Sequence, residues 1–213
     1  MKLICFDLDN TLINSEKAHV DSYNFALKKH GFKPWPFNKL VKLFGRPHDE
    51  VIQIITKRKD KNLLKKISKD KVSYLIKHSY KYAKIIPGTK QALKKLKKGF
   101  NLAIISNTSH KSVIALLKGS NLPKSYFKVI IGNDDAPHSK PYPDEILKAE
   151  KLVHHKADFM VGDSPYDILA GKKAKVKTIS VLTGRYSKAE LKKYKPDYIL
   201  KNIKFLPKTV LED

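Results

Sequence analysis

The stretch Leu3-Ile4-Cys5-Phe6-Asp7-Leu8-Asp9-Asn10-Thr11 opens the chain, and the expected fold can be worked out from it. Its four apolar residues are typical of a short buried strand. Asp7 and Asp9 then follow at the carboxyl end of that strand, where open parallel α/β sheets bind their ligands. Two like charges buried side by side are unfavourable unless a cation or a shared proton compensates them. The pattern therefore indicates a metal site, although taken alone it also fits a capped turn.

Three later segments place polar residues in a similar setting. They are Leu102-Ala103-Ile104-Ile105 running into Ser106-Asn107-Thr108, the loop Ser139-Lys140-Pro141-Tyr142-Pro143-Asp144, and Phe159-Met160-Val161-Gly162 running into Asp163-Ser164-Pro165-Tyr166-Asp167. Taken singly, Ser106 fits a helix cap, Lys140 a surface lysine and Asp163 a turn residue. All four segments in this order, each after an apolar run or in a connecting loop, indicate one shared site.

In these motifs the chain resembles the haloacid dehalogenase-like (HAD) phosphohydrolases. The similarity is to the branch with a small helical cap, which includes phosphoglycolate phosphatases and β-phosphoglucomutases. It extends from the first residue to about Pro207. The matching residues are Asp7, Asp9, Ser106, Lys140, Asp163 and Asp167, together with Pro87-Gly88, Gly132 and Asp134-Asp135. Asn10 departs from the pattern, because it stands where a glycine is frequent.

The hydrophobic pattern divides the chain into two regions. Residues 14–86 are predicted to form helices, of which the first is capped by Ser15 and the second covers about Asn38–Phe44. From Pro87 onward strands alternate with helices, which predicts a parallel sheet covered on both faces. The fold class is therefore α/β: a HAD-like Rossmannoid core from residues 1–13 and 87–213, with an inserted α-helical bundle cap domain at 14–86.

The resemblance implies a role for each residue of the first motif. Asp7 is implied to be the nucleophile that forms an aspartyl-phosphate, since a carboxylate can attack phosphorus once a metal neutralises the phosphate. Asp9 is implied to be the general acid and then the general base. The implied cofactor is Mg²⁺, a hard ion that prefers oxygen ligands, held by Asp7, the backbone carbonyl of Asp9 and Asp163.

The remaining motifs are expected to bind phosphate or to support the site. Ser106, Asn107 and Lys140 are the expected phosphate-binding residues, because the transferring phosphoryl group needs donors and cations. Thr11 is expected to fix the turn after Asp9. Asp167 either orients Lys140 or a metal-bound water, or it caps the helix that follows.

Substrate recognition is expected to fall to the cap, which can close over the pocket. Within the loop Gly45-Arg46-Pro47-His48, Arg46 could hold a second phosphate or a carboxylate in bidentate fashion, or it could be a solvated surface residue. His19 lies on the first cap helix, where some sugar-phosphate mutases of this family carry a functional histidine. A packing or hinge role is the alternative for His19.

The bulk composition limits the class of protein. A chain of 213 residues with a formal net charge of +24 invites a nucleic-acid function, but only Arg46, Arg58 and Arg185 are arginines, and base-reading sites favour arginine. We therefore expect nucleic-acid binding to be weak and non-specific. The single Cys5 excludes an intramolecular disulfide, and together with the absence of any long apolar run it fits a cytoplasmic protein without a membrane span.

The leading functional prediction is a Mg²⁺-dependent phosphatase that hydrolyses a small phosphorylated metabolite, similar to phosphoglycolate phosphatase. A second carboxylate at Asp9 favours phosphate esters over halides, because a leaving halide needs no proton. The alternatives are a β-phosphoglucomutase-like phosphotransferase on the same core and a nucleic-acid-binding protein on a HAD core. Neither the substrate nor the oligomeric state can be predicted from the sequence.

Overall fold

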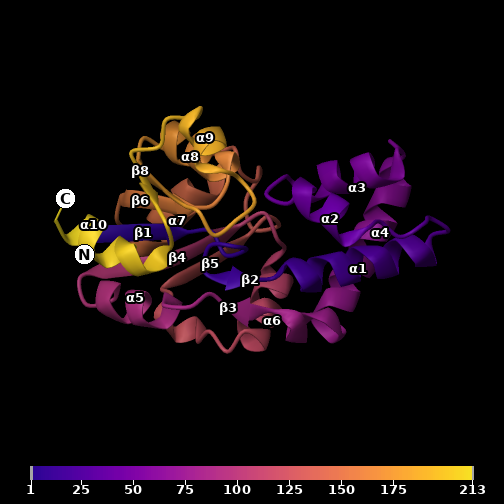
Figure 1. The fold of residues 1–213 in the computed structure, drawn as a ribbon, viewed down its shortest axis with the longest axis horizontal. Coiled ribbons are helices and arrows are strands. Elements are labelled where there is room, and N and C mark those ends of the chain that lie inside the picture. The colour runs from indigo at the N-terminus through magenta and orange to yellow at the C-terminus, as the bar shows by residue number, and fades with distance from the viewer. Residues whose placement is uncertain (1, 213) are drawn as a thin grey trace.

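A six-stranded parallel sheet forms the centre of the molecule in the computed structural model, which describes residues 2–212 (Figure 1). The strand order is β5-β4-β1-β6-β7-β8, and every neighbouring pair runs parallel. The strands are β1 (Lys2–Phe6), β4 (Phe100–Ser106), β5 (Val129–Gly132), β6 (Ala157–Gly162), β7 (Lys177–Val181) and β8 (Tyr198–Leu200). The predicted α/β fold is thereby confirmed, and β5 and β8 lie at the two edges of the sheet.

The register of the sheet brings the polar motifs to one edge. Phe6, the last residue of β1, lies opposite Ile104 of β4 and Val161 of β6. Asp7 follows directly, and Ser106 and Asp163 come two positions after their respective partners of Phe6. Since the carboxyl ends of parallel strands share an edge, three motifs far apart in sequence become neighbours.

Helices cover both faces of the sheet, which explains why the central strands are continuously apolar. Ile4 and Phe6 pack on one face against residues of α5 (Thr89–Leu96), α6 (His110–Gly119) and α10 (Leu206–Leu211). Leu3 and Cys5 pack on the other face against α7 (Asp144–Val153) and α8 (Pro165–Lys173). Burial raises the pKa of the Cys5 thiol far above its usual range, which fits the expected role of a small core residue.

Four helices lie between two short strands and away from the sheet, at the right of Figure 1. They are α1 (Glu16–Lys29), α2 (Phe37–Leu40), α3 (His48–Thr56) and α4 (Lys61–Lys77), followed by the 3₁₀ turn Ser79–Tyr82. These helices share their own hydrophobic cluster, which includes Leu27, Ile52 and Ile67. The separate cluster supports the predicted division into core and cap, whose boundaries stay a prediction.

Several local details differ from the sequence prediction. The chain enters and leaves the helical region through β2 (Ile13–Asn14) and β3 (Lys84–Ile85), which pair antiparallel where only helix was expected. The helix predicted at 38–44 is α2 followed by a 3₁₀ turn at Val41–Leu43. Ser15 precedes α1 but makes no side-chain cap, because its hydroxyl is bonded to Asp9.

The C-terminal part contains a capping box and several short helical elements. Ser187 and Glu190 form the reciprocal bonds of this box at the start of α9 (Lys188–Lys192). Further 3₁₀ turns cover Lys124–Tyr126 and Ile203–Phe205, and α10 closes the chain. Within residues 2–212, no helix has both the length and the apolar character needed to cross a bilayer.

Candidate active site

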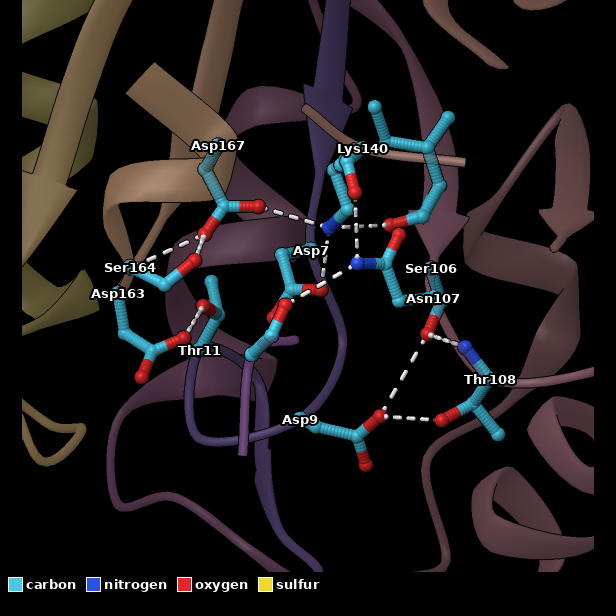
Figure 2. Close-up of polar contacts among 12 residues, drawn as sticks. Asp7, Asp9, Thr11, Ser106, Asn107, Thr108, Lys140, Asp163, Ser164 and Asp167 are labelled. Atoms are coloured by element: carbon cyan, nitrogen blue, oxygen red, sulfur yellow. Dashed lines mark hydrogen bonds and ion pairs between the residues drawn. The ribbon is translucent and has the colours of Figure 1, made fainter. Parts of the chain in front are cut away.

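One cavity at the carboxyl edge of the sheet collects most of the predicted residues. Its lining from the sheet side includes Asp7, Asp9, Asn107, Lys140 and Asp163, and its lining from the helical side includes His19, Tyr23, Arg46, His48 and Lys71. Figure 2 shows the sheet-side residues and the polar contacts between them. Two parts of the chain that are distant in sequence therefore enclose a single space.

Lys140 is the buried cation at the base of this site. Its ammonium nitrogen lies 2.7 Å from Oδ1 of Asp7, 2.7 Å from Oδ1 of Asp167 and 3.3 Å from the carbonyl oxygen of Ile105 (Figure 2). These contacts use all three of its donors. Burial alone would lower the pKa of Lys140, but the carboxylates of Asp167 and Asp7 raise it above its usual range. Lys140 is therefore permanently charged and fixed in position.

Asp167 takes both of the roles that the sequence left open. One oxygen pairs with Lys140, and the other accepts hydrogen bonds from the backbone N–H of Ser164 at 3.0 Å and from its hydroxyl at 2.6 Å. The bond from the Ser164 backbone N–H is part of the capping box of α8. Since both of its oxygens are bonded within the protein, Asp167 helps to hold Lys140 in position.

An acidic cluster stands next to Lys140. Oxygens of Asp7, Asp163 and Asp167 lie within 4.8 Å of one another. Burial raises the pKa of Asp7 to about 7 against the opposing effect of Lys140, and burial together with the Asp7 charge raises that of Asp163 well above its usual value. Three carboxylates against one ammonium leave negative charge that a divalent cation would compensate.

The carboxylates of this cluster fit Mg²⁺, to which each can offer one oxygen. Oδ1 of Asp163 accepts a long bond of 3.4 Å from the Thr11 hydroxyl, and Oδ1 of Asp7 accepts from Lys140. The second oxygen of Asp7 and that of Asp163 have no hydrogen-bond partner among residues 2–212. Oxygen donors of this kind are what Mg²⁺ prefers. Thr11 thus touches Asp163 as well as closing the turn, where its N–H reaches the Leu8 carbonyl at 3.4 Å.

Asp9 is half-buried and lines the same cavity as Asp7, and its carboxylate contacts residues of both the core and the helical region. Its Oδ1 is bonded to the Ser15 hydroxyl and lies 3.0 Å from Nε2 of His19. Its Oδ2 accepts from the Thr108 hydroxyl at 3.0 Å and lies 3.5 Å from Oγ of Ser106 (Figure 2). Burial would raise the pKa of Asp9, but His19 and the hydroxyl donors hold it well below its usual range. In this arrangement Asp9 is ionised.

His19 connects Asp9 with a lysine of α4. Its Nδ1 lies 3.1 Å from the ammonium nitrogen of Lys71, and its Nε2 faces Asp9. An ammonium has only donors, so Nδ1 must accept and Nε2 carries the proton that is donated to Asp9. Burial and the Lys71 charge lower the pKa of His19 below its usual value, which agrees with this neutral tautomer.

Asn107 and Arg46 have contacts that differ from simple phosphate or substrate binding. The amide nitrogen of Asn107 donates to the carbonyls of Gly45 at 3.1 Å and Lys140 at 3.0 Å, so it ties the cap loop to the core. One terminal nitrogen of Arg46 is bonded to Glu50, which lies four residues later, in α3. The Nε of Arg46 is buried and has no partner among the described residues. Both side chains still line the cavity.

The sequence reasoning missed two residues of the site. Lys71 occupies a position on the apolar face of α4, in line with Leu64, Ile67 and Leu75, and a lysine at such a position is a detectable signal. Thr108 is the last residue of the motif Ser106-Asn107-Thr108 and was given no role, but its hydroxyl donates to Asp9. Asn10 has a φ of 61°, which explains why glycine is frequent at its position.

Comparison with known proteins identifies the group to which the chain is similar. The sequence model described as "Haloacid dehalogenase-like hydrolase" matches residues 4–181. A protein of Caldanaerobacter subterraneus subsp. tengcongensis, provisionally named pyrophosphatase PpaX, is 33% identical over 204 residues, which cover 94% of this chain and 90% of the relative. The pyrophosphatase PpaX of Anoxybacillus flavithermus is 30% identical over 207 residues, covering 94% and 92%.

The fold is also similar to that of solved structures. A crystal structure titled as a predicted phosphatase from Clostridium acetobutylicum matches with a TM-score of 0.89 at 25% identity, covering 100% of this chain and 99% of that one.

Proposed function

This chain belongs to the haloacid dehalogenase-like hydrolase family and is a phosphatase, and we propose that it hydrolyses a small phosphorylated metabolite through an aspartyl-phosphate on Asp7. The observation that carries this proposal is the state of the Asp7 carboxylate. Lys140 holds one of its oxygens at 2.7 Å, while the other has no protein partner among the described residues and Asp7 lines the cavity. A nucleophile needs one fixed and one accessible oxygen in this way.

In the first half-reaction the accessible oxygen of Asp7 forms a bond to phosphorus while the bond from phosphorus to the leaving oxygen breaks. The leaving oxygen takes a proton from Asp9. Asp9 must therefore be protonated at this step, although its bonds to Ser15, His19 and Thr108 favour the ionised form. Since Ser15 and His19 belong to the cap side, a change in those contacts on substrate entry would raise the pKa of Asp9.

In the second half-reaction water attacks the phosphorus of the aspartyl-phosphate, and the phosphorus–oxygen bond to Asp7 breaks. Asp9 accepts the proton of the attacking water, and orthophosphate leaves. The hydrogen-bonded, ionised form of Asp9 in this structure is the form that this step requires. His19 stabilises that form, because its Nε2 donates to the carboxylate at 3.0 Å.

Mg²⁺ would be held by Asp7, Asp163 and the backbone carbonyl of Asp9, and would neutralise charge on the phosphoryl oxygens when bound. Lys140, Ser106 and Asn107 are proposed as donors to the same phosphoryl group. In this structure Lys140 donates to Asp7 and Asp167, Asn107 donates to the carbonyls of Gly45 and Lys140, and the Ser106 hydroxyl donates toward Asp9 at 3.5 Å. Phosphate binding would therefore exchange some of these contacts.

The identity of the leaving group is the finer part of this proposal. The names of the relatives make inorganic pyrophosphate a candidate substrate, beside the phosphoglycolate-like esters that the motifs suggest. A β-phosphoglucomutase-like transfer, in which a sugar hydroxyl replaces water as the acceptor, is a second candidate. His19 supports it, because some sugar-phosphate mutases of this family carry a functional histidine on the first cap helix and His19 lies 3.0 Å from Asp9.

A screen of phosphorylated compounds for orthophosphate release tests the proposal. The panel should contain pyrophosphate, phosphoglycolate, β-glucose 1-phosphate and p-nitrophenyl phosphate, each with Mg²⁺ and with excess EDTA. We expect turnover that EDTA abolishes. Release that persists in EDTA would refute the metal dependence, and slow release that a sugar bisphosphate accelerates would favour the mutase.

A further inference from the structure

The cap side of the cavity carries donors that the mechanism above does not use. Arg46, His48 and Lys71 all line the same space as Asp7 and Asp9. None of them is required to activate Asp7 or to bind the transferred phosphoryl group. Their contacts within the protein leave part of their hydrogen-bonding capacity unused, and the nature of that capacity indicates what kind of ligand fits.

Lys71 is a buried ammonium with too few partners. Its side chain is only 3% exposed. The one acceptor that it reaches among residues 2–212 is Nδ1 of His19 at 3.1 Å, and its nitrogen also lies 4.9 Å from the centre of the Tyr23 ring. Two of its three N–H groups are therefore left for another ligand. A buried cation without a paired carboxylate is unfavourable, so an anion in the cavity would stabilise it.

His48 presents a second donor to the same space. Its Nδ1 lies 2.6 Å from the Tyr23 hydroxyl. Burial raises the pKa of Tyr23 and lowers that of His48, so the phenol keeps its proton and the imidazole is neutral. In the tautomer in which the phenol donates to Nδ1, Nε2 carries the imidazole proton and can donate to a ligand. That Nε2 is buried and has no hydrogen-bond partner among the described residues, and Nε of Arg46 is in the same condition.

The two sides of the cavity differ in charge. On the sheet side the cluster of Asp7, Asp163 and Asp167 outnumbers Lys140, which suits a divalent cation. On the cap side Lys71 has no carboxylate within salt-bridge distance in the described part of the chain, and the Arg46 guanidinium is only partly paired with Glu50. A ligand that spans the cavity would meet a cation site at one end and anion-binding donors at the other.

We propose that Lys71 and His48, together with Arg46, form a subsite for a second anionic group of the substrate. The substrate class is then a phosphate ester or anhydride that carries a carboxylate or another phosphate close to the transferred phosphoryl group. A neutral sugar phosphate lacks such a group. This inference rests on the proposed function, because it concerns the leaving-group side of the same site.

Matched substrate pairs test the subsite. Phosphoglycolate and 2-hydroxyethyl phosphate differ by one carboxylate, while pyrophosphate and acetyl phosphate are both anhydrides and differ in the second phosphate. With Mg²⁺ present, we expect kcat/KM to favour the doubly anionic member of at least one pair by about tenfold or more, as a hydrogen bond to a charged group allows. The pair that shows the preference identifies the second group as carboxylate or phosphate.

Variants of the cap residues locate the preference. Lys71→Met should lower the preference for the doubly anionic substrate, measured as the ratio of kcat/KM within a pair, by about tenfold. His48→Phe, which keeps a ring beside Tyr23, should lower this preference by about threefold or more. Lys66→Met is the matched control, because Lys66 is exposed on the same helix, and it should leave the preference unchanged. The ratio within a pair cancels any effect that Lys71 exerts on Asp9 through His19.

The outcomes separate the two levels of the proposal. Equal loss on both members of a pair, or no preference in the unmodified protein, would overturn the subsite while leaving the phosphatase intact. Failure to hydrolyse even p-nitrophenyl phosphate with Mg²⁺ would overturn the proposed mechanism itself. Thermal unfolding of each variant shows whether it folds, and His48→Phe tests the subsite if Lys71→Met does not.

Discussion

The ammonium nitrogen of Lys140 lies 2.7 Å from Oδ1 of Asp7, and both side chains are buried. Lys140 comes from the loop before α7, while Asp7 follows β1, so 133 residues separate the partners. Asp167 binds the same ammonium at 2.7 Å, so that one cation is held by two buried carboxylates. We therefore expect both the stability and the activity of the protein to depend on Lys140.

Removing the Lys140 ammonium should lower both the stability and the activity of the protein. Lys140→Met leaves two buried carboxylates without their partner, and we expect a loss of about 3–5 kcal/mol in the free energy of unfolding, together with loss of phosphatase activity. Denaturant unfolding measures the first effect. The exposed Lys151→Met is the control and should stay within about 0.5 kcal/mol of the unmodified protein. A Lys140→Met variant of unchanged stability would contradict the described pairing.

Gly184 should be sensitive to a single added methyl group. A Cβ at this position would lie 1.7 Å from Oδ2 of Asp163, so that the carboxylate must move. We expect Gly184→Ala to raise the Mg²⁺ concentration needed for half-maximal activity by about tenfold, comparable to other disturbances of metal-ligand geometry. Gly99→Ala is the matched control, since nothing lies within 4 Å of a Cβ there. Equal metal dependence in both variants would exclude Asp163 as a ligand.

Activity should rise with pH at limiting Mg²⁺. Burial raises the pKa of Asp7 to about 7, and only its ionised form is a nucleophile, so kcat/KM should increase as the pH passes through 7. A divalent cation favours the ionised carboxylate, and the midpoint should therefore move to lower pH as Mg²⁺ is added. Initial rates between pH 5.5 and 8.5 at several Mg²⁺ concentrations test this. A pH midpoint that does not change with the Mg²⁺ concentration would contradict the binding of Mg²⁺ by Asp7.

Glu145 should make the protein less stable at higher pH. Burial raises its pKa from 4.5 to about 8, and neither oxygen has a hydrogen-bond partner among the described residues. Because the folded pKa exceeds the unfolded one, this group's contribution is full below pH 4.5 and is lost as the pH rises through 8.

Glu145→Gln should remove that part of the pH dependence. The variant should gain stability relative to the unmodified protein between pH 5 and 8, at about 1.4 kcal/mol per unit of pKa separation. Melting temperatures across this range, with exposed Glu212→Gln as control, provide the measurement. Parallel stability curves would show that Glu145 is not buried as a carboxyl.

The sheet and its order of motifs could be predicted from the sequence, because central strands buried on both faces are continuous apolar runs. β1, β4 and β6 were recognised in this way, and the residues that follow them converge because parallel strands share a carboxyl edge. The two-residue strands β2 and β3 could not be recognised, since their pairing of Ile13 with Ile85 depends on tertiary register rather than on a local pattern.

The contacts within the site were less predictable than its composition. The sequence predicts Ser15 as a helix cap, but the Ser15 hydroxyl donates to Asp9 instead. Asp9 precedes Ser15 by six residues, and the turn between them brings the two side chains together. Asp167 combines two roles that local sequence presents as alternatives. Lys71 is one of many lysines in a chain with a net charge of +24, so composition does not distinguish it, although it lies on the buried face of α4.

The nucleophile is the central claim, and trapping the phosphoryl group tests it most directly. The protein is mixed with Mg²⁺ and its best substrate, quenched in acid during turnover and digested, and the peptide containing Asp7 is examined by mass spectrometry with and without borohydride reduction. We predict an aspartyl-phosphate at Asp7. Borohydride should reduce this acyl phosphate to homoserine with release of phosphate, and Asp7→Asn should abolish both signals. Phosphoryl groups on another residue, or full activity in Asp7→Asn, would contradict the account.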